Sequence, residues 1–187
     1  MGRLIVFNSV SVDGFFVDGN GDMSWAHNAN KDPEWDAFVA DNAAGGGVLV
    51  FGRITYEMMA GYWPTPIAAQ NDPEVARGMN ALPKVVFSRT LQKASWSNTR
   101  LVKGDLAGEI RSMKARPEDM AILGSGSIVS LVAQEGLVDE FQLVVIPVIL
   151  GSGRTMIEGI DRKLRLKRKT ERPFRNGNVL LCYEPMA

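Results

Sequence analysis

The chain has 187 residues, 45% of them hydrophobic, which suits one globular domain over residues 1–187 with a substantial core. Its 21 basic and 21 acidic residues balance, so the whole molecule has no net field that would attract nucleic acid or an acidic membrane. One cysteine and one histidine exclude an intramolecular disulfide and argue against a metal site, and the absence of a membrane-length apolar run or signal peptide predicts a cytoplasmic protein.

The first quarter of the chain predicts two strands around a loop and a helix. Residues 4–12 are typical of a strand, and residues 13–32, with closely spaced glycine and asparagine, predict a long mobile loop. Asp32-Pro33-Glu34 then opens a helix, because Asp is a good N-cap and Pro suits the first helical position. Gly45-Gly46-Gly47 ends that helix, and residues 48–51 form a short, wholly apolar strand.

The same alternation continues to the C-terminus. A helix is expected at 54–62, a loop at 64–72, and a second helix behind Asp72-Pro73-Glu74. Further strands are expected at 84–88, 101–103, 120–123, 141–150, 164–172 and 179–183, with helices between 106 and 113 and from 128. Pro147 should bend the strand at 141–150, and Asn176-Gly177 predicts a hairpin turn. The pattern indicates an α/β fold with a mostly parallel sheet covered on both faces and an antiparallel C-terminal edge.

The sharpest local signal lies at residues 121–128, where a buried strand runs through Gly124-Ser125-Gly126-Ser127 into a helix beginning near Ile128. Glycines let a ligand approach the backbone, and the free N–H groups of a helix N-terminus attract phosphate. The third glycine of a dinucleotide fingerprint is absent, since Val129 stands there. The alternative is therefore a tight strand–helix turn with no ligand.

Two further strands end in comparable residues. One leads into Gly52-Arg53-Ile54-Thr55-Tyr56, and another ends in Ser88-Arg89. Ligands of open α/β sheets sit beyond the carboxyl ends of strands, and arginine there accommodates the 2′-phosphate of NADP, whereas NAD sites use an acid. Taken singly, Arg53 or Arg89 reads as a solvated surface arginine, but their parallel placement favours NADP over NAD.

These motifs, together with Val10-Ser11-Val12-Asp13-Gly14 at the end of the first strand, resemble the dihydrofolate reductase-like superfamily over nearly the whole chain. The chain is most similar to the branch that contains the riboflavin-biosynthesis reductase domain and its stand-alone bacterial relatives. The resemblance implies a single-domain, three-layer fold and an NADPH-dependent reductase. It also implies a homodimer, because relatives of this branch commonly form one.

The resemblance assigns the cofactor to the carboxyl ends of the strands. The expected NADPH-binding residues are Val10, Gly52, Arg53, Thr55, Ser88, Arg89, Gly124, Ser125, Gly126, Ser127 and Ile128. Arg53 and Arg89 would meet the 2′-phosphate, and the nicotinamide would lie by Val10 and residues 13–18. We expect residues 13–25 to act as a lid, because glycines permit motion there and aromatic side chains can exclude water.

The substrate side offers fewer signals. Asp13 is the first choice for a catalytic, substrate-side polar group, although Asp-Gly also forms turns. Glu34 is a second acid that could serve as proton source, with Asp32 beside it, but both also fit the cap and first turn of a helix. Trp25, Tyr56 and Trp63 could wall a pocket for a planar heterocycle, or simply pack in the core.

One stretch departs from the even charge distribution. Residues 162–175 hold eight of the 21 basic residues and one of the 21 acidic residues, so the rest of the chain is acidic. Such a cluster is typical of nucleic-acid binding, but Leu164 and Leu166 alternate with basic residues there, which favours an edge strand guarded by charge.

The sequence therefore predicts a reductase that transfers hydride from NADPH to a small planar heterocycle, such as an aminopyrimidine of riboflavin synthesis. Dihydrofolate reduction is the alternative within the class. A non-catalytic nucleotide- or nucleic-acid-binding protein on the same fold is the alternative outside it.

Overall fold

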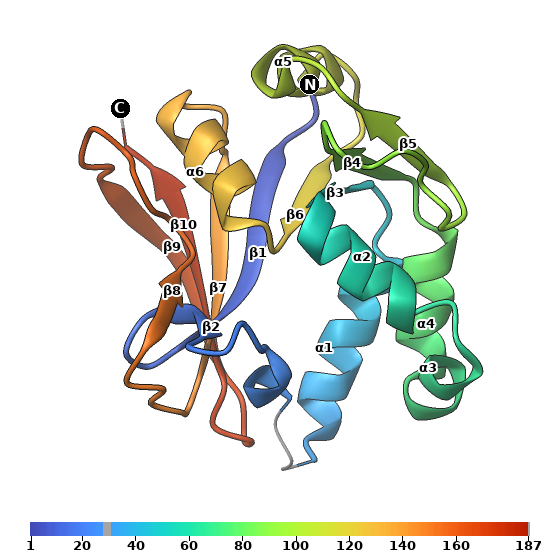
Figure 1. Cartoon of the computed structure of the whole chain (residues 1–187). Helices are drawn as coiled ribbons and strands as arrows, with labels where there is room; N and C mark the ends of the chain where they lie inside the picture. Colours follow the sequence, from blue (N-terminus) through green and yellow to red (C-terminus); the bar gives the residue numbers. More distant parts are fainter. Residues whose placement is uncertain (28–30, 187) are drawn as a thin grey trace.

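A central eight-stranded sheet organises the molecule, for which a computed structural model describes residues 1–27 and 31–186. The strand order is β5-β4-β3-β6-β1-β7-β10-β9 (Figure 1). The strands are β1 (Leu4–Ser11), β3 (Val48–Gly52), β4 (Lys84–Phe87), β5 (Thr99–Val102), β6 (Met120–Leu123), β7 (Glu140–Ile146), β9 (Leu166–Pro173) and β10 (Val179–Pro185). The six strands from β5 to β7 in this order pair in parallel, and β10 pairs antiparallel with β7 and β9. This confirms the predicted mostly parallel sheet with an antiparallel edge.

Helices cover both faces of the sheet and give three layers (Figure 1). They are α1 (Pro33–Ala44), α2 (Arg53–Tyr62), α3 (Pro66–Asn71), α4 (Pro73–Ala81), α5 (Leu106–Lys114) and α6 (Gly126–Gln134). Side chains on β3 show the two layers, because Val50 packs with α5 and α6 while Leu49 and Phe51 pack with α2 and α4. Alternation of side chains along a strand requires this division.

Helix α1 begins where the predicted capping residues place its start. Asp32 is its N-cap and accepts the N–H of Glu34 at 3.0 Å, and the helix ends before Gly45. Asp72 is also the N-cap residue of α4, but its side chain makes no capping hydrogen bond. The strand at 141–150 stops at Ile146, since Pro147 lacks the N–H that a ladder needs.

Two predicted loops contain regular structure, so the predictions for 13–32 and 64–72 as loops were wrong in these parts, and residues 28–30 lie outside the described residues. Residues Phe15–Asp18 form β2, which pairs with β8 (Gly153–Thr155), and a 3₁₀ turn spans Ser24–Ala26. Helix α3 occupies 66–71, where Thr65 Oγ1 accepts the N–H of Ala68 at 3.3 Å. These elements are short, and β2 depends on a partner distant in sequence, so periodicity does not reveal them.

The basic stretch contains the edge strand of the sheet. Strand β9 pairs only with β10, and all eight of its residues are exposed. Its charges are paired within the protein: Lys169 with Glu140 at 2.7 Å, Arg172 with Glu34 at 2.7 Å, and Lys167 with Glu184 at 3.6 Å. This arrangement supports the guarded edge rather than a free basic patch.

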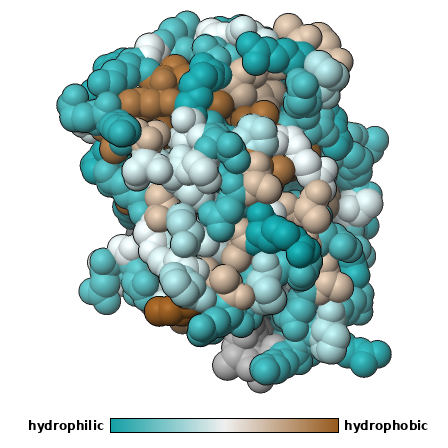
Figure 2. Space-filling view, turned by 90° about the vertical axis from the view of Figure 1, so that its right-hand side faces the viewer, coloured by the Kyte–Doolittle hydropathy of each residue, from teal (hydrophilic) through white to brown (hydrophobic). Residues whose placement is uncertain are grey.

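The surface seen from the side of β5, α3 and α4 is largely hydrophilic, with one compact hydrophobic patch and scattered smaller ones (Figure 2). Within residues 1–27 and 31–186, none of the helices has the length and apolar character that crossing a membrane requires.

Candidate functional site

A cleft of about 690 Å³ lies beyond the carboxyl ends of β3, β4 and β6. One side comes from the N-terminal turn of α2 and the other from α6, with residues of β2 and of the segment 154–158 closing it. The cleft contains eight of the eleven predicted cofactor-binding residues: Gly52, Arg53, Thr55, Ser88, Ser125, Gly126, Ser127 and Ile128. The three outside its lining are Val10, which pairs with Val145 inside the sheet, Arg89, which is exposed beyond Ser88, and Gly124, which is buried.

The N-cap residues of α2 and α6 are bonded to each other. The N–H of Gly52 donates to Ser125 Oγ at 2.7 Å, and Ser125 Oγ donates to Thr55 Oγ1 at 3.0 Å. The N–H of Ser125 also donates to Thr55 Oγ1, at 3.1 Å. Three hydrogen bonds therefore hold two strand–helix junctions, about 70 residues apart in sequence, in one fixed cradle.

The turn before α6 is also held from the centre of the sheet. Gly124 and Ser125 adopt positive φ angles of 68° and 60°, conformations that only glycine adopts freely. The buried side chain of Asn8 on β1 accepts the N–H of Gly124 at 2.6 Å and donates to the Met156 sulfur at 3.2 Å. Asn8 thus fixes this turn and anchors the segment on the opposite wall of the cleft.

The glycines permit close contact of the protein with itself. A Cβ at Gly124 would lie 2.7 Å from the Thr55 side chain, and one at Gly126 would lie 2.9 Å from the Met156 carbonyl oxygen. A Cβ at Gly52 would lie 2.6 Å from Ser125 Oγ. The glycines are therefore needed to close the cradle itself, as expected from the alternative of a tight strand–helix turn.

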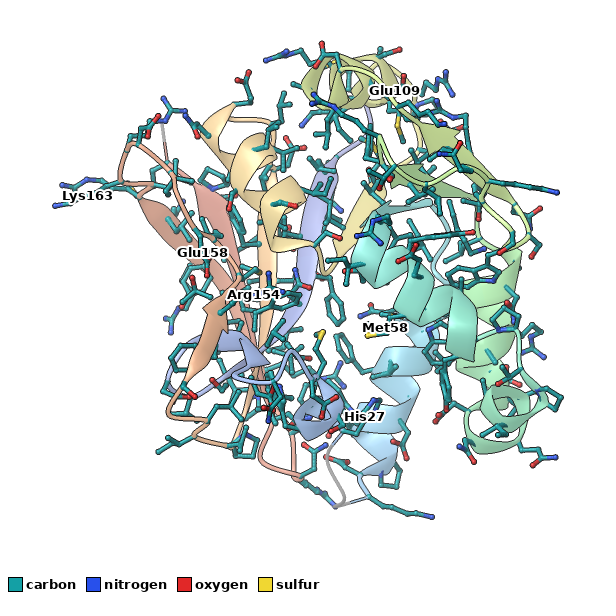
Figure 3. All side chains as sticks on the ribbon, viewed as in Figure 1. His27, Met58, Glu109, Arg154, Glu158 and Lys163 are labelled. Atoms are coloured by element: carbon teal, nitrogen blue, oxygen red, sulfur yellow. The ribbon has the colours of Figure 1, made fainter. Side chains whose placement is uncertain are left out.

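The cradle presents donors to the cleft. Gly126 and Ser127 occupy the first turn of α6, where helix N–H groups have no intrahelical partner, and the structure shows no bond to either within its described residues. Arg53 and Arg154 line the cleft from α2 and β8, and Glu158 is the carboxylate on its lining. Figure 3 places Arg154 and Met58 on opposite sides of this space. Backbone dipole and arginine charge together favour an anion here.

Arg53 and Glu158 already have partners in the protein. Arg53 Nη1 lies 2.9 Å from Glu57 Oε2, one turn along α2, with both side chains about half exposed. Glu158 Oε1 accepts the N–H of Thr155 at 3.2 Å. For Arg154 no ion pair is found with any residue that the structure describes.

The two candidate acids lie away from the cleft lining. The carboxylate of Asp13 accepts the hydroxyl of Ser11 at 2.7 Å and the N–H groups of Leu150 and Gly151, the latter at 2.7 Å. The Ser11 hydroxyl is the main cause that lowers the pKa of Asp13, so this carboxyl is ionised at neutral pH. Glu34 accepts two hydrogen bonds from the Arg172 guanidinium, at 2.7 and 3.2 Å.

The three candidate aromatic residues separate into different places. Tyr56 is 2% exposed, and its hydroxyl accepts the N–H of Trp96 at 2.9 Å inside the core. Trp25 packs against the hydrophobic cluster that contains Val144 and Ile146 of β7, and it donates its indole N–H to the Asp22 carbonyl at 3.1 Å. Trp63 lines a second cavity, of about 370 Å³, between α1, α2, α4 and the sheet. We call this second cavity the trough.

Two segments of the cleft lie outside the predicted cofactor-binding residues. They are the segment 16–23 and the run Arg154, Thr155, Met156 and Glu158, and of these the second gave no signal in the sequence. The first group belongs to the expected lid, and Phe16, Val17, Gly21 and Met23 do form one wall. In the second group, Arg154 and Thr155 belong to the three-residue strand β8, which is too short to show a period, and Met156 and Glu158 follow it.

Comparisons with known proteins agree with this architecture. Residues 3–180 match the model of the RibD C-terminal domain. The chain is 27% identical over 182 residues to the uncharacterized protein YyaP of Bacillus subtilis (strain 168), covering 97% of this chain and 94% of that protein. A protein of Shewanella sp. PV-4 that is provisionally assigned to riboflavin biosynthesis superposes with a TM-score of 0.75 at 22% identity, covering 99% of both chains. Dihydrofolate reductase of Enterococcus faecalis, solved with NADP(H), superposes with a TM-score of 0.65 at 15% identity, covering 100% and 98% of the two chains. These two likenesses show the shared fold.

Proposed function

The chain belongs to the RibD C-terminal domain family, and from this membership we propose that it is an NADPH-dependent reductase whose cofactor occupies the cleft. The observation that carries the proposal is the cradle in which Thr55 and Ser125 lock two helix N-termini together. Paired N-termini at the carboxyl edge of a parallel sheet suit the two linked phosphates of a dinucleotide.

The residues present fit that cofactor. The cleft volume of about 690 Å³ falls in the range of cofactor pockets, and its lining carries two arginines against one carboxylate. The N–H groups of Gly126 and Ser127 would hold the pyrophosphate. Arg53 would meet the 2′-phosphate, with Arg89 beyond the end of β4 as the second arginine. The Arg53–Glu57 pair is an exposed i,i+4 pair of about 0.5 kcal/mol, so a phosphate dianion can replace it.

The proposed reaction is the reduction of an unsaturated bond in a small planar heterocycle. When bound, NADPH supplies a hydride, which is two electrons and one proton, to the acceptor carbon, while a solvent proton completes the reduced bond. The protein must therefore orient the two reactants and keep water from the donor ring. Phe16 of β2 and Met23, which follows this strand, lie on the cleft wall, where they can exclude water. Asp13, ionised and clamped, would act at the substrate side as a fixed charge and hydrogen-bond acceptor rather than as an acid.

Cofactor binding tests this proposal directly. NADPH should bind at least about tenfold more tightly than NADH, because a charge-assisted contact to the extra phosphate contributes roughly 1.5–3 kcal/mol. In a fluorescence titration, Arg53→Ala should weaken the binding of NADPH and leave the binding of NADH nearly unchanged. Arg77→Ala, which removes an arginine of α4 outside the cleft, is the matched control. Equal affinities for the two cofactors would reject the assignment.

A further inference from the structure

The two central strands of the sheet are covered unequally on their two faces. On β1 and β6, Leu4, Val6 and Ile122 face α5 and α6 and are 0% exposed. The residues that alternate with them, Ile5 and Phe7 on β1 and Ala121 and Leu123 on β6, are only half-buried. Central parallel strands are ordinarily buried on both faces. The middle of the sheet therefore carries an apolar strip that α1, α2 and α4 leave uncovered.

The trough is the space above this strip. Its volume is about 370 Å³, which matches a small ligand of one or two rings. Phe7 and Leu123 form its floor. Met59 of α2 and Trp63, which directly follows α2, line one wall, opposite Val39 of α1. Aromatic and thioether side chains offer flat, polarizable surfaces on which a planar ring stacks.

The trough also adjoins the cleft. Helix α2 turns Met58 into the cleft and the next residue, Met59, into the trough. On β6, Leu123 lies in the trough immediately before the Gly124 turn that shapes the cradle. The two spaces thus share α2 and the end of β6 as a partition, and a ring in the trough lies on the other side of that partition from the cofactor cradle.

The charges around the trough decide what it can hold. No lysine, arginine or histidine is found on its lining, which is formed by residues that the structure describes. The polar lining consists of Asp41, Asn42, Asp119 and Gln142. Asp119 is paired with Arg3 at 3.1 Å, whereas Asp41 is exposed on α1 without an ion pair in the described part of the chain. An anion in the trough would lose its water, find no cation and face the Asp41 carboxylate.

We propose that the trough binds an uncharged, planar, mainly apolar ring compound, and that it excludes phosphorylated or carboxylated ones. The binding and its charge selection do not rest on the proposed reductase function. A phosphorylated aminopyrimidine or a folate carboxylate therefore does not match the trough.

Two probes with the same ring test the charge selection. Quinoxaline is neutral at pH 7, and quinoxaline-2-carboxylate carries one negative charge. Calorimetry without cofactor should show that the carboxylate binds at least about tenfold more weakly, because its charge is desolvated without a partner. Quenching of tryptophan fluorescence by quinoxaline, lost in Trp63→Phe, would place the ring in the trough.

Two variants test separately the charge at the rim of the trough and the volume inside it. Asp41→Lys puts a cation on the rim of the trough at an exposed helical position. It should reduce the difference in affinity between quinoxaline and its carboxylate by about threefold, without changing the affinity for quinoxaline. Val39→Phe fills part of the trough, so it should weaken the binding of quinoxaline by at least about fivefold. Equal affinity of both probes, or no binding of either, overturns the proposal.

The outcomes also separate this inference from the reductase assignment. If quinoxaline binds selectively but NADPH does not bind, the inference about the trough is supported and the proposed function is wrong. If NADPH binds with its expected preference over NADH while quinoxaline causes no heat and no quenching, the reductase assignment stands and the inference about the trough is wrong.

Discussion

Thr55 and Ser125 are each other's principal partners, although they belong to different helices. Thr55 Oγ1 accepts both the N–H and the hydroxyl of Ser125, at 3.1 and 3.0 Å, and Thr55 is almost fully buried. Because Ser125 Oγ also accepts the N–H of Gly52, one hydroxyl pair determines how α2 and α6 meet. The shape of the cleft depends on this pair.

Thr55→Val should therefore weaken both the fold and the cleft. Valine keeps the shape of threonine but leaves the N–H of Ser125 without its acceptor, which costs about 1–3 kcal/mol of unfolding free energy. Ser125→Gly removes the hydroxyl and tolerates the φ of 60° at that position. Denaturant unfolding of both single variants and the double variant should give a coupling energy of about 1 kcal/mol. Additive effects would show that the two hydroxyls do not act together.

Gly124 should tolerate no side chain, for a reason internal to the protein. Its φ is 68°, and a Cβ would lie 2.7 Å from the Thr55 side chain. Gly124→Ala should lower the unfolding free energy by about 1–3 kcal/mol, from backbone strain and displacement of Thr55. Gly61→Ala is the matched control, since its Cβ on α2 would meet nothing within 4 Å, and this substitution should stabilise by about 0.5–1 kcal/mol. Equal stability of Gly124→Ala and the parent would contradict the close contact.

Asp13 should be a determinant of loop order. Its carboxylate holds the N–H groups of Leu150 and Gly151, and Ser11 keeps its pKa below the ordinary value. Because the folded pKa is lowered, the stabilising effect is present above the unfolded pKa near 3.8 and is lost as the pH falls through the folded value. Asp13→Asn should speed hydrogen exchange at Leu150 and Gly151 at pH 7, with Asp18→Asn as the control for a nearby acid.

The sequence predicted that the residues of the cradle meet at one edge of the sheet, because the signals for it are local. Gly52, Arg53 and Thr55 follow directly on an apolar strand, and Ser125 and Gly126 do the same on another, so parallel-sheet geometry brings them to one edge. The partners that complete the site are not local. Asn8 reads as an ordinary polar residue on a strand, and its contact with Gly124 spans 116 positions.

The aromatic residues also show what could not be predicted from the sequence. Tyr56 lies on the helix predicted at 54–62 and Trp63 directly follows that helix, and residue type alone treats the two alike. Packing separates them: the Tyr56 hydroxyl satisfies a backbone N–H in the core, whereas Trp63 borders a cavity. Which face of a helix is covered depends on the neighbouring helices, and the sequence of the helix does not contain that information.

Lys84 provides a prediction about stability at alkaline pH. Its side chain is 1% exposed, and its ammonium donates to the carbonyl oxygens of Leu82, Asn80 and Ser97 at 2.6, 3.3 and 3.3 Å. It also lies 4.4 Å from the centre of the Trp96 ring. Within residues 1–27 and 31–186, no carboxylate forms an ion pair with it. Burial therefore lowers the pKa of Lys84 from 10.5 to about 8.

The direction of the effect follows from proton binding. Between pH 8 and 10.5 the unfolded chain holds a proton on Lys84 that the folded chain has released, so stability rises with pH in this window. The gain is at most about 1.4 kcal/mol per pH unit, and below pH 8 the burial penalty is constant. Lys84→Met removes the titrating group, and the difference between the two denaturation curves cancels the other groups that titrate there. The free energy of unfolding of the parent should therefore rise relative to Lys84→Met from pH 8 to 10.5, and parallel curves would show that the Lys84 pKa is ordinary.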